Sequence, residues 1–267
     1  MENKDTTNNP ADMLQFYIDI GVDESIEDAP INRIRESKVP AISAPIIKIS
    51  EQPQEITPKG GSQEAAKLAT GLIEKISSLE ELKSALESFD GFVLKRTATQ
   101  ILFAEGNPKS KIMIIGDNPS ADEDLSGKLF VGKSGHMLDQ MLKSIGIDRE
   151  ENAYLTYLIN WYPPGNRLPS EVESSLSLPF VQKHIELINP EIIICLGDIA
   201  TKSLLGTQQS VSRIHGKWHE YKSGKMEHPA AIIPLFRPEY LLASPIQKSQ
   251  AWEDLLKIKE KMQELKL

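Results

Sequence analysis

Five short segments of the chain carry residue types that could bind a ligand or take part in chemistry. The first is residues 116–124, GDNPSADED, where a turn and several carboxylates, including Asp117, follow an apolar run. A strand, a tight turn and carboxylates suit a pocket for a small molecule or nucleotide, although acidic loops are more often simply solvated. The segment lacks the glycine patterns of dinucleotide-binding and triphosphate-binding loops, so we do not expect those ligands.

The second segment, residues 127–135, surrounds the aromatic residue Phe130 with glycines. It leads into an expected helix, whose first backbone N–H groups, around Lys133 and Ser134, could receive a phosphate. Phe130 could stack on a planar base, although a phenylalanine in an apolar loop is more often packing. The segment therefore suits a nucleotide-like ligand without requiring one.

The other three segments combine prolines, aromatic residues and basic residues. Residues 160–169, NWYPPGNRLP, form a rigid proline-rich loop with Arg167, which either presents aromatic groups to a ligand or is only a structured turn. Residues 213–219, RIHGKWH, contain two histidines but no third metal ligand, so no metal site is expected. Residues 236–245 begin a short helix with Pro238 in its first turn.

The elements that must position these segments alternate between strands and helices. Strands are expected at residues 111–115, 153–159, 191–196 and 230–236, and helices at 62–74, 78–89, 134–145, 171–188, 198–205 and 245–265. This alternation predicts an α/β fold, a three-layer α/β/α sandwich with a mostly parallel central sheet. Ligands bind at the carboxyl ends of such strands, so the loops after residues 115, 159 and 236 should meet.

The 267 residues suit one α/β domain with an additional N-terminal part. We expect a leader at residues 1–27 with an amphipathic helix, a flexible linker at 28–61, and the α/β domain at 62–267. The leader helix either docks on a partner protein or is an incidental helix. We expect the protein to be a monomer.

Composition and charge exclude some classes of protein. No apolar run approaches the ~20 residues that span a bilayer, and the polar N-terminus lacks a signal peptide's apolar core, so we expect a cytoplasmic protein. The single cysteine, Cys195, rules out an internal disulfide and predicts a buried strand residue. A net charge of −8 argues against tight nonspecific DNA binding but is compatible with a local basic groove.

Taken in order, these segments resemble the family 4 uracil-DNA glycosylases from about residue 78 to residue 265. The family's GE(A/G)PG motif is similar to GDNPS here, which places Asp117 at the acidic catalytic position and Asn118 beside the base. The family's PFVGxxG is similar to LFVGKSG, which retains the uracil-stacking aromatic residue as Phe130. Residues 16–33 also resemble the leader of alphaproteobacterial members. The resemblance implies a uracil-DNA glycosylase-like fold and DNA as the partner.

The chain departs from the family at several functional positions. The asparagine that reads uracil falls on Tyr157, counted back from the double proline, and the histidine of HPxYLL is replaced by Arg237. Asp117 and Arg237 are therefore the expected catalytic pair, and Tyr157 is expected to fill part of the base pocket. DNA contacts are expected from Lys133, Ser134, Arg167, Arg213, His215 and Lys217.

Family members also bind a [4Fe–4S] cluster through four cysteines. The corresponding positions carry other residues here, such as Val93, Trp161 and Ser177. We therefore expect no iron–sulfur cluster and no other cofactor, with Trp161 filling the space by packing.

Two functions remain open from the sequence. The chain is either a DNA glycosylase that hydrolyses the N-glycosidic bond of uracil or another deaminated base during base excision repair, or an impaired relative that binds nucleic acid or a partner protein. A pocket deep enough for a flipped pyrimidine favours the enzyme. A pocket plugged by Tyr157, with Asp117 paired to Arg237, favours the binding protein.

Overall fold

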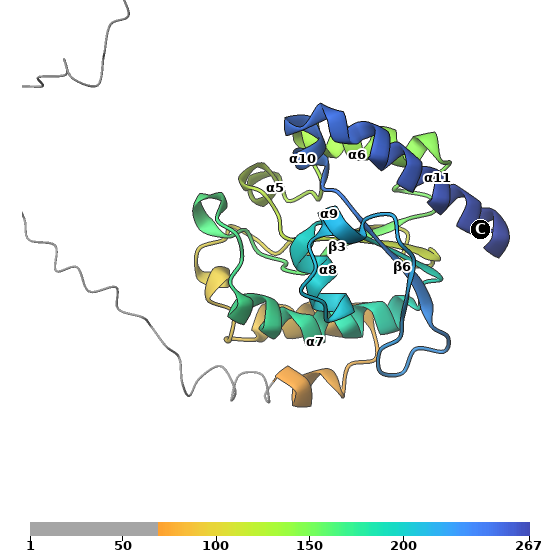
Figure 1. Cartoon of the computed structure of the whole chain (residues 1–267). Coiled ribbons are helices and arrows are strands. Elements are labelled where there is room, and N and C mark those ends of the chain that lie inside the picture. Colours follow the sequence, from red (N-terminus) through yellow and green to blue (C-terminus); the bar gives the residue numbers. More distant parts are fainter. Residues whose placement is uncertain (1–68) are drawn as a thin grey trace, which may run out of the picture. The chain divides into compact units, whose positions relative to one another are not determined.

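The computed structural model describes residues 69–267 (Figure 1). The expected leader helix, the expected linker and the first part of the helix expected at 62–74 lie outside the described residues. Residues 69–73 are helical. None of the helices in the described part of the chain is long and apolar enough to cross a membrane.

A six-stranded sheet forms the middle layer, with strand order β1-β3-β2-β4-β6-β5. Its inner strands β3, β2, β4 and β6 are parallel, and each edge strand pairs antiparallel with its neighbour. The strands are β1 (Ala104–Gly106), β2 (Ile112–Gly116), β3 (Tyr154–Tyr157), β4 (Ile192–Leu196), β5 (His219–Tyr221) and β6 (Ala230–Leu235). The mostly parallel sheet expected from the sequence is confirmed.

The central strands form because their apolar runs are buried on both faces. Every residue of β2, β3 and β4 is buried, as is typical of strands covered by helices on two sides. Alternate side chains face opposite layers: Met113 and Ile115 join one core, and Ile112 and Ile114 join the other. The edge strands β1 and β5 were not predicted from the sequence, because three residues are too few to show the alternation of apolar and polar residues that is typical of a strand.

Helices cover both faces of the sheet (Figure 1). One layer contains α6 (Gly132–Ser144), which contacts both α10 (Pro238–Ala243) and α11 (Lys248–Leu265). The other contains α4 (Leu79–Ser88), α7 (Glu171–Ile188) and α8 (Asp198–Leu205). The short connecting helices are η1 (Val93–Arg96), α5 (Ala121–Ser126), η2 (Pro164–Asn166), α9 (Val211–Ile214) and η3 (Pro245–Gln247).

The topology brings the ends of the parallel strands together. Gly116 at the end of β2 is in register with Tyr157 of β3 on one side and Leu196 of β4 on the other. The chain runs from β2 out to β3 and then returns to β4 on the opposite side of β2. Such a reversal opens a crevice at the carboxyl ends of the strands, which is where ligands bind in this class of sheet.

Candidate active site

Asp117 is the first residue after β2, and its carboxylate is buried at the switch point of the sheet. Its Oδ1 accepts a hydrogen bond of 2.7 Å from the backbone N–H of Ala200 in the first turn of α8. Gly197 makes room for the carboxylate, because a Cβ there would clash with it. Burial raises the pKa of Asp117 to about 6, while the Ala200 N–H and Arg237 oppose that rise. The carboxylate is thus charged at neutral pH but takes up a proton under mildly acidic conditions.

Arg237 is the residue immediately before α10, so it enters the same crevice from the end of β6. Its Nη1 lies 3.7 Å from Oδ2 of Asp117, and its side chain is 39% exposed. At this separation the two form an ion pair without a hydrogen bond. Asp117 therefore does not consume the donors of the guanidinium group, which stay free to bind a ligand.

Phe130 and Tyr157 form an aromatic wall of the site. Their ring centroids are 4.6 Å apart at an interplanar angle of 36°. Gly116 allows both rings to approach the end of β2: a Cβ there would lie 2.6 Å from the Tyr157 ring and 3.0 Å from Cζ of Phe130. The glycine that ends β2 is therefore a packing requirement of this wall.

The hydroxyl group of Tyr157 is held by Glu123 of α5. It donates a 2.7 Å hydrogen bond to Glu123 Oε1 and accepts one of 3.3 Å from the backbone N–H of Phe130. Burial, together with the charge of Glu123, raises the pKa of Tyr157 well above its usual value, so the phenol stays protonated. The other oxygen of Glu123 accepts from the backbone and side chain of Ser120, which caps α5.

Sequence analysis missed Glu123 as a site residue. The spacing of Ser120 and Glu123 is that of a capping box, which could have located the start of α5. Its contact with Tyr157, 34 residues further along the chain, depends on the tertiary structure. A capping residue thus also fixes the aromatic wall.

A cavity of about 280 Å³ lies between the aromatic wall and the ion pair. Of the site residues predicted from the sequence, Asp117, Asn118, Phe130, Tyr157, Arg167 and Arg237 line it. Asn118 donates from Nδ2 to the carbonyl of Pro119 at 2.9 Å, while its buried Oδ1 has no hydrogen-bond partner among the described residues. The cavity thus combines an aromatic face, a carboxylate, a guanidinium group and a free amide oxygen.

Arg167 stands at the rim of this cavity with its guanidinium group engaged. It makes a two-pronged contact with Glu173 in the first turn of α7, with N–O distances of 2.6 and 2.8 Å. This contact ties the proline-rich loop to the helix that follows it. The loop is therefore an anchored part of the rim.

The other expected DNA-contact residues do not line the cavity. Lys133, Arg213 and Lys217 are exposed, and Ser134 is half-buried at the start of α6. His215 is fixed by Asp254 of α11 at 2.5 Å and packs against Phe236, with ring centroids 4.4 Å apart. Their contact with DNA stays a prediction.

Among the positions expected for the iron–sulfur cysteines, Trp161 packs in an aromatic cluster. Trp161 lies against Phe92 at a centroid distance of 4.6 Å, and Phe92 contacts Phe180 at 5.4 Å. Val93 is exposed, and Ser177 is buried. With one cysteine in the chain, buried in β4, these residues do not fit a four-cysteine cluster. Within residues 69–267, no cluster of three or more potential metal ligands is present.

The fold and the site define a class of protein: an α/β/α sandwich whose switch-point pocket presents an aromatic ring and a buried carboxylate to a ligand. The sequence model of the Uracil DNA glycosylase superfamily matches residues 103–256, and the chain belongs to this superfamily. The resemblance noted from the sequence motifs is thereby confirmed.

Several relatives are similar over more than half of the chain. The type-4 uracil-DNA glycosylase of Sulfurisphaera tokodaii is 32% identical over 190 residues, which is 69% of this chain and 85% of that protein. The type-4 enzyme of Archaeoglobus fulgidus is 34% identical over 178 residues, 62% of this chain and 89% of that protein. The type-4 enzyme of Thermotoga maritima is 34% identical over 145 residues, 54% of this chain and 72% of that protein.

Proposed function

We propose that this protein is a DNA glycosylase that hydrolyses the N-glycosidic bond of uracil in DNA. Family membership and relatives named type-4 uracil-DNA glycosylase support this function. The observation that carries the proposal is the cavity of about 280 Å³, which places Phe130, Asp117 and Arg237 around one space. Tyr157 forms a wall of that space and does not plug it.

In the proposed reaction, a uracil flipped out of the DNA stacks on Phe130. Breaking the glycosidic bond develops positive charge on the sugar and negative charge on uracil. The Asp117 carboxylate stabilises the sugar cation and orients the attacking water, and the Arg237 guanidinium group stabilises the departing uracil anion. The free donors of Arg237 and the charged state of Asp117 at neutral pH both suit these roles.

We propose that Asn118, not Tyr157, contacts the edge of the base. The Tyr157 hydroxyl group is already engaged with Glu123 and Phe130. Asn118 lines the cavity and has an unpartnered, buried Oδ1, which could accept the N3–H of uracil. Uracil selection in this chain would then depend on the loop after β2.

The broader context of the proposed enzyme follows the sequence expectations. We propose that it acts as a cytoplasmic monomer without an iron–sulfur cluster, and that the leader is a site for a partner protein. Phosphate contacts are assigned to Lys133, Ser134, Arg213, His215 and Lys217, and Arg167 contributes at the rim. Substituting Arg213 or Lys217 tests this assignment. Each substitution should weaken DNA binding equally for all sequences and should make binding less dependent on salt.

The full chain, incubated with single-stranded and duplex oligonucleotides containing one uracil, tests the function directly. With wild type and with the control variant Asp90→Asn, the oligonucleotide should become cleavable by alkali at an abasic site. Asp90 is an exposed carboxylate that does not line the cavity. Cleavage should vanish with Asp117→Ala. Absence of abasic product from uracil and from deaminated purines would reject the glycosylase.

The second candidate function is a binding protein that retains the scaffold without catalysis. The 3.7 Å pairing of Arg237 with Asp117 favours it, since each group partly neutralises the other. This alternative predicts binding of uracil-containing DNA without cleavage. It also predicts that Asp117→Ala leaves the affinity unchanged in a fluorescence anisotropy titration.

A further inference from the structure

Phe130 has an unusual backbone conformation for a residue proposed to stack on the base. Its φ is +49°, in the left-handed region that favours glycine. Gly135, in the first turn of α6, lies so close to the carbonyl of Phe130 that a Cβ at position 135 would not fit. A side-chain-bearing residue keeps such a conformation only when its surroundings hold it in place.

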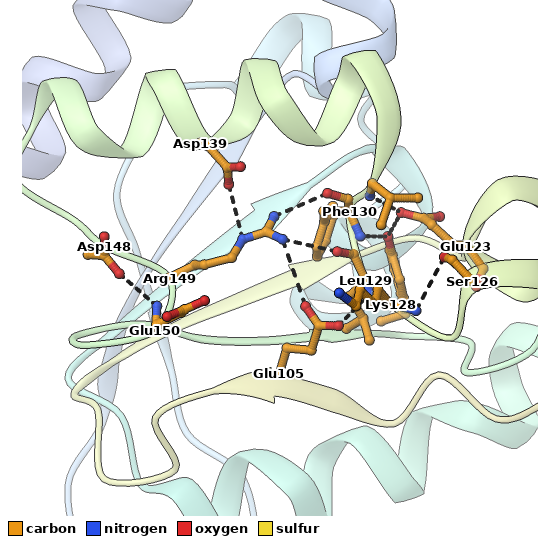
Figure 2. Close-up of polar contacts among 12 residues, drawn as sticks. Glu105, Glu123, Ser126, Lys128, Leu129, Phe130, Asp139, Asp148, Arg149 and Glu150 are labelled. Atoms are coloured by element: carbon orange, nitrogen blue, oxygen red, sulfur yellow. Dashed lines mark hydrogen bonds and ion pairs between the residues drawn. The ribbon is translucent and has the colours of Figure 1, made fainter.

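Arg149, between α6 and β3, supplies one such contact (Figure 2). Its Nη1 donates to the carbonyl of Leu129 at 3.1 Å, and its Nη2 donates to the carbonyl of Phe130 at 3.3 Å. The side chain of Arg149 is 19% exposed, so these bonds are largely shielded from water. The planar fork of one guanidinium group therefore fixes two consecutive carbonyl groups.

Two carboxylates form ion pairs with the guanidinium group (Figure 2). Asp139 Oδ1 of α6 lies 3.0 Å from Nε of Arg149, and Glu105 Oε2 of β1 lies 3.8 Å from Nη1. Glu105 also accepts a 2.9 Å hydrogen bond from the backbone N–H of Leu129. Side chains from β1, α6 and the α6–β3 connection thus form one network around Leu129 and Phe130, which lie shortly before α6.

The opposite side of the Phe130 peptide is fixed as well. Its backbone N–H donates to the hydroxyl group of Tyr157, which Glu123 orients. The N–H and the C=O of Phe130 therefore both have defined partners. Arg149 does not line the cavity, whereas Phe130, whose carbonyl it binds, does.

We propose that Arg149, held by Asp139 and Glu105, is a positioning residue that presents the Phe130 ring as a preformed stacking surface for the flipped base. This role rests on the proposed glycosylase function, and it explains how the enzyme would gain affinity for the flipped base. A lysine at position 149 would retain the charge but lack the fork, so charge alone should not suffice.

Steady-state kinetics on a uracil-containing oligonucleotide and inhibition by free uracil test the proposal. In Arg149→Met and Arg149→Lys, KM and the Ki of uracil should rise about tenfold or more, while kcat stays within about threefold, because stacking contributes similarly to ground and transition states. Lys183→Met removes a partly buried ion pair with Glu186 on α7 and should change neither constant.

A second readout follows Phe130 without requiring activity. The full chain labelled with 4-fluorophenylalanine contains seven phenylalanines, and Phe130→Leu identifies the Phe130 signal in the ¹⁹F NMR spectrum. That signal should shift or broaden in Arg149→Met and Asp139→Asn, and should keep its position in Lys183→Met. This measurement can be made even if the wild-type chain cleaves no uracil. Lack of cleavage would reject the proposed function but not the positioning role of Arg149.

Two outcomes would overturn the positioning role. One is an unchanged Phe130 signal in a folded Arg149→Met chain. The other is full function, with unchanged Ki, in Arg149→Lys. If Arg149→Met fails to fold, Arg149→Lys and Asp139→Asn provide the same two readouts, since each keeps a polar group of similar size at its position.

Discussion

The two sides of the cavity are built in different ways. On the aromatic side, the Tyr157 hydroxyl group and both peptide groups of Phe130 have hydrogen-bond partners. On the charged side, the Asp117 carboxylate accepts a hydrogen bond from the Ala200 N–H and forms a loose ion pair with Arg237. The aromatic side is therefore preformed, whereas the charged side keeps unused donors and a carboxylate whose pKa is raised by burial to about 6.

This difference assigns base binding to the aromatic side and stabilisation of the transition state to the charged side. A rigid aromatic surface gains affinity because little conformational entropy is lost when a base stacks on it. A buried carboxylate, kept at a cost to stability, interacts strongly with a charge that develops in the transition state. Substitutions on the charged side should therefore change kcat most, and those on the aromatic side should change affinity or stability.

The largest effect is expected for Asp117→Asn, which should lower kcat about 10²- to 10³-fold because the sugar cation loses its counter-charge. In wild type, kcat should rise with pH through about 6 and level off above it, since only the ionised carboxylate is active. A pH profile of single-turnover rates checks both points. Full activity of the Asp117→Asn variant would contradict the electrostatic role of the Asp117 carboxylate.

The same substitution should stabilise the protein. The folded pKa of about 6 exceeds the ordinary carboxyl value, so the folded state loses stability relative to the unfolded state as pH rises from about 4 to 6. At pH 7.5, Asp117→Asn should raise the free energy of unfolding by up to about 3 kcal/mol. Urea denaturation at pH 4 and pH 7.5 measures this, and the gain should be smaller at pH 4.

The next largest effect is expected for Arg237→Met, which should reduce kcat about 10²-fold because the uracil anion loses its donor. The guanidinium group also holds the pKa of Asp117 down, so the midpoint of the pH profile should move above 6. Arg237→His tests whether a histidine, the residue expected in the family at this position, restores part of the rate. An unchanged midpoint in Arg237→Met would show that the ion pair is not formed in solution.

The smallest effect on rate is expected for Tyr157→Phe. The ring would still pack against Phe130, but the Phe130 N–H would lose its acceptor and Glu123 one donor. We expect a loss of about 1–2 kcal/mol in the free energy of unfolding with kcat nearly unchanged. Thermal denaturation and initial rates measure the two. A large fall in kcat would mean that the aromatic side takes part in the chemistry.

Much of the scaffold could be predicted from the sequence because its signals are local. The apolar runs that became β2, β3, β4 and β6 are buried on both faces, and their alternation with helices implies a parallel sheet. Asp117 and Phe130 were found because they sit in ordered motifs beside such runs. The strand expected at 153–159 ends at Tyr157, since after that point the chain leaves the sheet for the proline-rich loop.

The sequence by itself determined the class of fold, the order of the loops and the residues with the right chemistry, because periodicity and motif spacing are properties of neighbours in the chain. Only the tertiary structure decided which groups are already engaged. Glu123 binding to Tyr157, and Arg149 binding to the backbone of Leu129 and Phe130, join residues 34, 20 and 19 positions apart. Such contacts depend on how α5, α6 and β3 pack against one another, and the linear sequence does not display that packing.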